Sequence, residues 1–206
     1  MLKEAINSTY FDYYKENLFC LEEAIEKLVE RIYEIDQRRE ARGQRKLCDN
    51  VRYRIKSPES MEEKLKKRGF AGGGKSAVVN VYDAAGIRII CPYIDDVYVM
   101  AKELGKCSDI EVKETKDYIR NPKKNGYRSY HMIVRTGILN KGRTHYVTVE
   151  IQIRTMVMNS WASAEHQLKY KKDTSDEESR ALLKRCADEM LKIDYSMMKI
   201  RDMMSE

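Results

Sequence analysis

The sequence lacks long apolar runs and paired-cysteine motifs, and it has only three histidines. No stretch approaches the roughly 20 consecutive apolar residues that a membrane-spanning helix needs, so no membrane span is expected. The five cysteines are scattered without C-x-x-C spacing, and their number is odd. This pattern argues against a disulfide framework and against a structural zinc site. We therefore expect a reduced, cytoplasmic protein.

Charged residues are abundant. They make up 35% of the 206 residues, against 42% hydrophobic residues. The length suits one substantial core and is short for two domains. The formal net charge of +6 indicates an anionic partner such as a nucleotide, a phosphate or RNA, without choosing among them.

Residues 146–155 carry the clearest strand pattern, because apolar and polar side chains alternate along them. The apolar face, expected to be buried, consists of Val147, Val149, Ile151 and Ile153. The opposite face consists of Thr148, Glu150, Gln152 and Arg154. Charged groups in a row are costly beneath a core and useful beneath a ligand. The alternative is a half-solvated strand of an antiparallel sheet.

Two long helices are expected near the ends of the chain. Residues 9–42 and 176–203 carry apolar residues at three- and four-residue spacing. The expected apolar side of the second helix consists of Leu182, Leu183, Cys186, Met190, Ile193 and Met197. Its methionines favour a packing surface within one subunit or between subunits. We expect one domain with an N-terminal helical region (1–45), a core (46–172) and a C-terminal helix (173–206).

A basic strand followed by a helix start predicts a phosphate site. Arg54 and Lys56 lie on one side of the strand expected over 51–56, and the SPES sequence that follows supplies an N-cap and a proline at the first helical position. The free N–H groups of a helix N-terminus bind phosphate. Ser60 and Lys64 extend this site along one helical face. The alternative is an ordinary, well-capped surface helix.

The next segments add an acid and another arginine. Asp83 precedes a buried strand expected over 87–91, and an aspartate beside a phosphate pocket is a natural magnesium ligand. A turn or capping role is the alternative. Arg88 points away from the apolar side of its strand and must find an anion or a flat ring. Asp95 is expected to cap the following helix. The glycine-rich stretch 71–76 lacks P-loop spacing and is expected to be a flexible loop.

A basic, turn-rich segment follows the strand expected over 110–119. It combines turn residues with the cations Lys123, Lys124 and Arg128 and the aromatic rings of Tyr127 and Tyr130. Such a segment favours base stacking and phosphate binding. His131 follows at the start of the next strand, where it can contact a phosphate or a base.

Four segments together resemble the synthetase domain of the RelA/SpoT family, and in particular its stand-alone small alarmone synthetases. They are RIKSPES, YDAAGIRIICPYIDDV, DYIRNPKKNGYRSYH and VEIQIRTMVMNSWASAEHQLKYK, which follow in the family's order from about Val51 to Lys172. The resemblance implies an α+β fold. In this nucleotidyltransferase-like synthetase fold, a central mixed, mostly antiparallel β-sheet is surrounded by helices, with helical N- and C-terminal extensions.

The same resemblance implies a GTP pyrophosphokinase (GTP diphosphokinase). This enzyme transfers the β,γ-pyrophosphate of ATP to the 3′-hydroxyl of GDP or GTP and makes the stringent-response alarmones ppGpp and pppGpp. The implied ATP-binding residues are Arg54 and Arg88 on adenine, and Lys56, Ser60 and Lys64 on the phosphates. Asp83 and Glu150 would coordinate Mg²⁺, with Mn²⁺ as an alternative, and Glu150 would also be the base near the acceptor hydroxyl. Tyr127 would stack on guanine, and the implied acceptor pocket contains Lys124, Arg128, His131 and Gln152.

The resemblance also implies a homotetramer built by the flanking helices, with an alarmone or single-stranded RNA as a candidate allosteric ligand. The chain shows no His–Asp pair of the kind found in the metal-dependent hydrolase of long family members, so we expect synthesis without hydrolysis. Transfer of a phosphorus group needs positioning and charge neutralisation more than covalent chemistry.

Two alternatives remain open. One is a catalytically inactive regulator that binds RNA or a nucleotide. The other is a related nucleotidyltransferase with a different acceptor. Against RNA binding, Asp83 and Glu150 would repel a phosphate backbone unless a metal ion lay between them.

Overall fold

The computed structural model describes residues 8–171 and 177–204. Within these residues the elements follow in the order α1 (Ser8–Tyr14), α2 (Asn17–Glu40), β1 (Asn50–Ile55), α3 (Pro58–Lys67), α4 (Gly74–Asn80), β2 (Ala85–Cys91), α5 (Ile94–Gly105), β3 (Ile110–Asp117), β4 (Tyr130–Asn140), β5 (Arg143–Thr155), α6 (Met156–Lys171) and α7 (Glu177–Met204). The expected core boundary near residue 172 lies outside the described residues, and the expected division of the chain stays a prediction.

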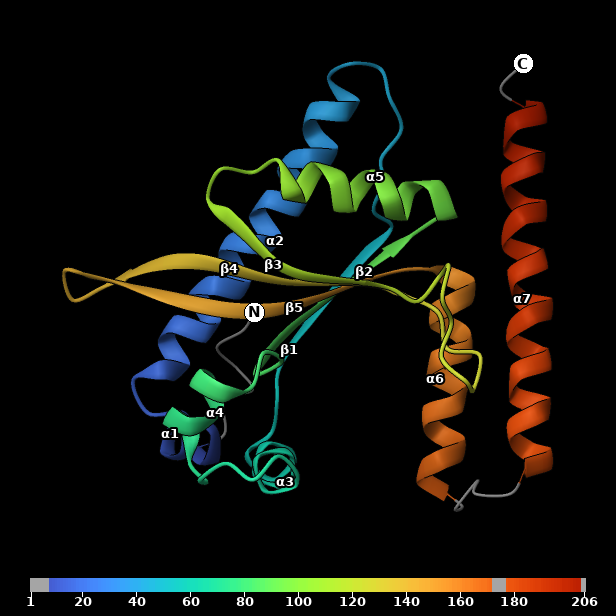
Figure 1. Ribbon diagram of the computed structural model, residues 1–206. Coiled ribbons are helices and arrows are strands. Elements are labelled where there is room, and N and C mark those ends of the chain that lie inside the picture. Colours follow the sequence, from blue (N-terminus) through green and yellow to red (C-terminus); the bar gives the residue numbers. More distant parts are fainter. Residues whose placement is uncertain (1–7, 172–176, 205–206) are drawn as a thin grey trace.

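The centre of the fold is a sheet with strand order β1-β2-β5-β4-β3 (Figure 1). Strands β2 and β5 run parallel, and the other three neighbouring pairs are antiparallel. Helices α2 and α5 pack against the sheet, whereas α6 and α7 lie side by side at one end of it. The expected α+β fold with a mixed, mostly antiparallel sheet surrounded by helices is confirmed.

Strand β5 shows why the sheet has one apolar and one polar face. The apolar residues of its alternating pattern are at most 2% exposed, as expected: Val147, Val149, Ile151 and Ile153. They belong to one core cluster with the apolar residues of α2 and α5. Because successive side chains of a strand point to opposite faces, Glu150 and Gln152 lie on the face away from these two helices.

The expected start of the helix after the basic strand is also confirmed. The hydroxyl oxygen of Ser57 caps α3 by accepting from the backbone N–H of Ser60 over 3.3 Å, and Pro58 occupies the first turn. Met61 and Leu65 are fully buried and fix the helix to the core. The N-terminus of α3 therefore begins directly beyond the end of β1.

Two sequence predictions near the N-terminal half were wrong. The helix expected over 9–42 is interrupted at Lys15, whose positive φ of 53° ends α1, and no glycine or proline marks this break. The stretch 71–76 is only partly a loop, because α4 begins at Gly74. A Cβ atom at Gly74 would lie 2.2 Å from the carbonyl oxygen of Tyr13, so glycine permits the close packing of α4 on α1.

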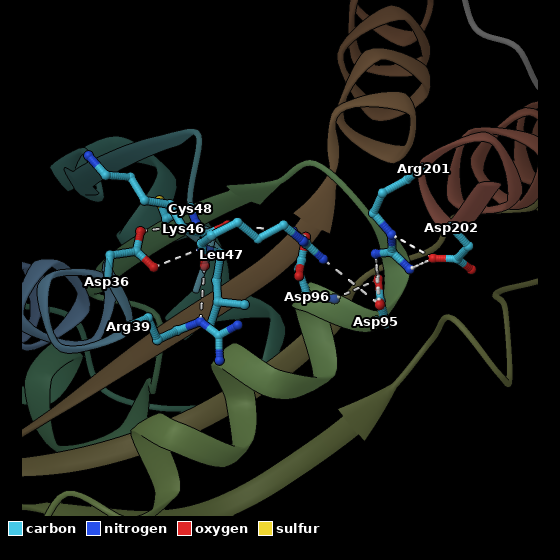
Figure 2. Close-up of polar contacts among 10 residues, drawn as sticks. Asp36, Arg39, Lys46, Leu47, Cys48, Asp95, Asp96, Arg201 and Asp202 are labelled. Atoms are coloured by element: carbon cyan, nitrogen blue, oxygen red, sulfur yellow. Dashed lines mark hydrogen bonds and ion pairs between the residues drawn. The ribbon is translucent and has the colours of Figure 1, made fainter. Parts of the chain in front are cut away.

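The expected cap of α5 was also wrong. The helix begins at Ile94 with Tyr93 at its N-cap position. Both carboxylate oxygens of Asp95 instead accept from Arg201 of α7, over 2.9 and 2.8 Å. Figure 2 shows Arg201 and Asp202 beside Asp95, with Asp96 next to it. A contact between residues this far apart in sequence cannot be read from local capping patterns.

Helix α7 turns only part of the face that its apolar spacing indicated to the protein. Leu182, Ile193 and Met197 are 44–51% exposed, whereas Ala187 and Asp194 are buried. The inner face combines these two residues with half-buried apolar residues, among which Leu183 and Met190 belong to the expected apolar side. Much of the expected apolar side lies at the surface of the described chain.

Candidate active site

Three neighbouring strands line a pocket of about 240 Å³ on the polar face of the sheet, and two of them, β1 and β2, place arginines around it. Arg52 of β1 faces Arg88 of β2 in the strand register, and Arg88 is in turn the register partner of Gln152 in β5. The walls of this pocket, called here the arginine pocket, include Arg52, Arg54, Asp83, Arg88, Glu150 and Gln152.

The positive charge of the arginine pocket is not fully balanced, as the state of Arg88 shows. Burial, reinforced by the charges of Arg154 and Arg54, lowers the pKa of Arg88. The Nε atom of Arg88 is buried without a hydrogen-bond partner among the described residues. A cluster of planar cations in this state favours a bound anion or a flat ring, as the sequence pattern of Arg88 predicted.

Asp83 lies at the edge of the arginine pocket between two lysines. One carboxylate oxygen, Oδ2, accepts from Lys56 over 3.0 Å and from Lys64 over 2.6 Å. Burial alone would raise the pKa of Asp83, but the two ammonium groups hold it below its ordinary value. The other oxygen, Oδ1, is buried without a partner among the described residues. Among the described residues, Asp83 thus keeps one unpaired oxygen, which is available to bind a further cation.

A second pocket of about 130 Å³ lies on the β3–β4 side of the same face and is called here the tyrosine pocket. Its walls include Lys116, Tyr118, Lys123, His131 and Glu150. The rings of Tyr118 and His131 meet edge to face with centroids 5.1 Å apart. The ammonium group of Lys123 lies 4.8 Å from the ring centroid of Tyr118 and 4.7 Å from that of Tyr127. Aromatic rings beside a cation suit a base and a phosphate.

Glu150 lines both pockets. Its Oε1 lies 3.2 Å from Nδ1 of His131, and its Oε2 accepts from Nε2 of Gln152 over 2.8 Å. Burial alone would raise the pKa of Glu150, but the contacts with His131 and Gln152 hold it below its ordinary value. An ionised carboxylate therefore stands where the two pockets meet.

The two carboxylates fit a hard divalent cation. Asp83 and Glu150 lie close enough for the charge of Asp83 to counteract the lowering of the pKa of Glu150. No group of three or more His, Cys, Asp or Glu side chains in the described part of the chain is arranged around one point. A cation held by these two residues would share its coordination with phosphate and water, as Mg²⁺ usually does.

Comparison with known proteins decides the family. A family model described as the region found in RelA/SpoT proteins matches residues 53–175. This chain belongs to the RelA/SpoT family. The expected membership is confirmed.

Two relatives of this chain are named GTP pyrophosphokinases. GTP pyrophosphokinase YwaC of Bacillus subtilis is 42% identical over 123 residues, which cover 60% of this chain and 59% of that protein. GTP pyrophosphokinase YjbM of the same organism is 34% identical over 154 residues, 74% of this chain and 72% of that protein. This RelA/SpoT chain thus spans less than two thirds of YwaC.

Solved structures agree over a larger part of the chain. Small alarmone synthetase 1 from Bacillus subtilis, bound to its product pppGpp, matches with a TM-score of 0.84 at 30% identity, covering 94% of this chain and 98% of that one. Small alarmone synthetase 2 of the same organism matches with a TM-score of 0.82 at 34% identity, covering 92% and 98%. None of the described helices is long and apolar enough to cross a membrane.

The structure of this RelA/SpoT member brings most of the expected site residues together. Lys56 and Lys64 line neither pocket but contact Asp83, and Tyr127 lines neither pocket but contacts His131.

Three further residues lie apart from the pockets. Arg128 donates to Asp188 of α7 and to the carbonyl oxygen of Ile119, and it lines neither pocket. Lys124 is exposed and lines neither pocket, and Lys123 occupies the tyrosine pocket instead. Ser60 accepts from the hydroxyl of Ser57 and is exposed.

Sequence reasoning missed several residues of the site. Arg52 lines the arginine pocket and lies on strand β1, whose alternating basic residues are visible in the sequence. Tyr118 lines the tyrosine pocket and lies just before the basic, turn-rich segment. Arg154 was placed on the polar face of its strand without a role. It is only 4% exposed and donates to Tyr127 and Gln152. The sequence feature that could have identified Arg154 is its place beside the acid Glu150 and the amide Gln152 on one face of the same strand.

Proposed function

We propose that this chain is a GTP pyrophosphokinase, which transfers the β,γ-pyrophosphate of ATP to the 3′-hydroxyl of GDP or GTP. The products are AMP and the alarmone ppGpp or pppGpp. The single observation that carries the proposal is that Glu150 lines both the arginine pocket and the tyrosine pocket. Two nucleotides bound on its two sides would bring their reacting groups together at one carboxylate.

In this proposal ATP occupies the arginine pocket. The guanidinium planes of Arg54 and Arg88 hold adenine by stacking. Lys56 and Lys64 then turn from Asp83 to the ATP phosphates and balance their negative charge. The N-terminus of α3 lies directly after β1 and adds backbone donors, which supports the expected role of Ser60 beside it.

The acceptor nucleotide occupies the tyrosine pocket. Tyr127 stacks on guanine, while His131 and Gln152 lie on the side of Glu150. Lys124 and Arg128 remain proposed acceptor ligands, and both would have to move to reach the pocket. The 3′-oxygen attacks the β-phosphorus of ATP, the bond from that phosphorus to the α–β bridging oxygen breaks, and AMP leaves. The carboxylate of Glu150 accepts the proton of the 3′-hydroxyl.

Asp83 and Glu150 would hold a magnesium ion, with manganese as the alternative. The free Oδ1 of Asp83 and the ionised state of Glu150 support this assignment. When bound, the ion would neutralise phosphate charge and help to orient the transferred group. The protein residues contribute binding, orientation and charge balance.

Incubation of the purified protein with ATP, magnesium and either GDP or GTP tests the proposal. Separation by anion exchange should show AMP together with a more highly charged guanosine nucleotide, and the amounts rank the two acceptors. AMP without that guanosine product would favour another acceptor. Absence of AMP in a folded sample would favour an inactive RNA- or nucleotide-binding regulator.

We propose further that the protein is a cytoplasmic homotetramer that synthesises alarmones without hydrolysing them. Five free cysteines suit a reducing compartment, and the exposed apolar side of α7 offers a surface for another copy. Light scattering at micromolar concentration tests the oligomer, and a monomer would contradict it. Incubation with ppGpp and Mn²⁺ tests for hydrolysis, and binding assays test alarmone and single-stranded RNA as allosteric ligands.

A further inference from the structure

Helix α1 packs against α3, the helix that carries Lys64, and against α4 (Figure 1). Lys15, with its positive φ of 53°, separates α1 from α2. Because of this break, α1 does not continue α2 and lies against the two helices instead. The last two residues of α1 are Tyr13 and Tyr14, and both hydroxyl groups bond to elements next to Asp83 or Lys64.

Tyr14 holds the backbone of Lys56. Its side chain is fully buried, and its hydroxyl group donates to the carbonyl oxygen of Lys56 over 2.8 Å. The backbone N–H of Lys56 donates over 2.9 Å to the carbonyl oxygen of Ala84, the residue after Asp83. Lys56 is therefore bonded on one side to the neighbour of Asp83 and on the other side to α1. Only its side chain stays free to turn from Asp83 to another anion.

Tyr13 connects α1 to the start of α4 through Glu62. Its hydroxyl group donates to Oε1 of Glu62 over 2.5 Å, and the same oxygen accepts from the backbone N–H of Gly73 over 2.7 Å. The rings of Tyr13 and Tyr14 meet edge to face with centroids 4.8 Å apart. One carboxylate oxygen of α3 thus joins α1 to the turn before α4, and the ring contact extends this connection to Tyr14.

The glycine-rich stretch 71–76 permits this contact. Gly73 has a φ of +101°, which side chains other than glycine rarely adopt. A Cβ atom at Gly74 would lie 2.2 Å from the carbonyl oxygen of Tyr13. The stretch that lacks P-loop spacing therefore serves the packing of α4 on α1.

Resting on the proposed function, we propose that Tyr14, supported by Tyr13, is a positioning residue for the phosphate side of the ATP site. It holds the backbone of Lys56 where the ammonium group reaches the ATP phosphates on leaving Asp83. Neither tyrosine lines a pocket, so both act through Lys56 and α3 and not by contact with ATP. The tyrosine pocket is lined by β3, β4, β5 and the loop between β3 and β4, so the effect is confined to ATP.

Calorimetric titration of the full-length protein tests this proposal. The ligand is an ATP analogue with a methylene group in place of the α–β bridging oxygen, added with magnesium and without an acceptor. Tyr14→Phe keeps the buried ring and removes only the donor to Lys56. It should raise the Kd of the analogue by about 3- to 10-fold, the effect of one lost hydrogen bond, and leave the Kd of GDP unchanged.

Two further variants on α1 sharpen this test. Tyr13→Phe should raise the Kd of the analogue by about 2- to 3-fold, because its hydrogen bond to Glu62 supports Tyr14 indirectly. Tyr10→Phe is the matched control, because Tyr10 lies on the same helix and its hydroxyl group makes no hydrogen bond within the described chain. The control should leave both Kd values unchanged.

A double-mutant cycle shows whether Tyr14 acts through Lys56. Lys56→Met alone should weaken binding of the analogue, and the addition of Tyr14→Phe should cause no further loss. A general loosening of the fold would instead add its own loss to that of Lys56→Met and would weaken GDP binding as well.

The proposal would be overturned by an unchanged Kd of the analogue in Tyr14→Phe, by an equal loss for GDP, or by full addition of the two losses in the cycle. An unchanged Kd in Tyr13→Phe would also overturn it, and this variant decides the question even if Tyr14→Phe does not fold. A wild type that binds the analogue but transfers no pyrophosphate would contradict the proposed function alone. A wild type that does not bind the analogue would contradict both.

Discussion

Asp188 of α7 accepts a hydrogen bond from Arg128 over 2.8 Å, and this contact joins the last helix to the loop that carries Tyr127. The same guanidinium donates to the carbonyl oxygen of Ile119 at the other end of the loop. Trp161 of α6 donates to the carbonyl oxygen of Leu183 over 3.0 Å and adds a second contact to α7. The position of the loop that carries Tyr127 therefore depends on how α7 packs against the rest of the protein.

Removal of this contact is expected to weaken acceptor binding selectively. Asp188→Ala should raise the KM for GDP or GTP by about 2- to 5-fold, the effect of a partly exposed ion pair, and leave the KM for ATP unchanged. Glu189→Ala is the control, because Glu189 pairs with Lys192 on the exposed side of α7. Equal kinetics for the two variants would contradict a link between α7 and the loop.

Gly126 is expected to be essential for the close approach of the loop to α7. Its φ is +91°, and a Cβ atom there would lie 2.6 Å from Cβ of Ala187. Gly142 also has a positive φ, of +73°, but has open space around it. Gly126→Ala should therefore lower the free energy of unfolding by about 1–3 kcal/mol more than Gly142→Ala, because only the first adds overpacking to backbone strain. Urea denaturation measures both, and equal losses would contradict the close approach.

Asp194 gives the docking of α7 a pH dependence. Burial raises its pKa to about 6, although the hydrogen bond from Thr155 over 2.8 Å acts in the opposite direction. Because the folded protein binds this proton more tightly than the unfolded chain, the stability that the proton contributes is full only below about pH 4 and is lost as the pH rises through about 6.

Asp194→Asn keeps an acceptor for Thr155 and removes the titration. Relative to the wild type, its free energy of unfolding should therefore rise by about 1–3 kcal/mol between about pH 4 and about pH 7.5. Urea denaturation at both pH values measures the difference. A difference that does not change with pH would contradict the raised pKa of Asp194.

Lys64 is expected to contribute to the use of ATP as a substrate, whereas Lys67 on the same helix is not. Lys64 donates to Asp83 over 2.6 Å at the arginine pocket, whereas Lys67 pairs with Glu63 on the exposed side of α3. Lys64→Met should reduce kcat/KM for ATP by about 10- to 100-fold, because a charge-assisted contact to phosphate is lost. Lys67→Met should have no effect, and a comparable loss in both variants would indicate a general electrostatic effect.

The sequence predicted those parts of the site that follow from local patterns. Alternation along β5 placed Glu150 and Gln152 on one face, and the SPES sequence placed the helix start after Arg54 and Lys56. The resemblance of four ordered motifs then predicted the sheet. The local patterns depend on residues that are close in sequence, and the resemblance depends on motifs that follow in the same order as in the family.

The remaining features depend on contacts between distant segments. The orientation of Arg128 is set by Asp188, 60 residues further along the chain. Ala187 of α7 faces Gly126 of the loop, whereas Leu182, Ile193 and Met197 of the same helix are about half exposed. Lys123 rather than Lys124 lines the tyrosine pocket. The sequence could not distinguish the two lysines, because an irregular loop has no periodicity from which side-chain directions can be predicted.

The most direct test of the central claim is a label-transfer experiment with ATP that carries a radioactive β-phosphate. With GDP or GTP as acceptor, the wild type should move the label into the guanosine product and leave unlabelled AMP, and Glu150→Gln should abolish this transfer while both nucleotides still bind. Label that remains in ADP, or transfer that continues unchanged in Glu150→Gln, would contradict pyrophosphate transfer at Glu150.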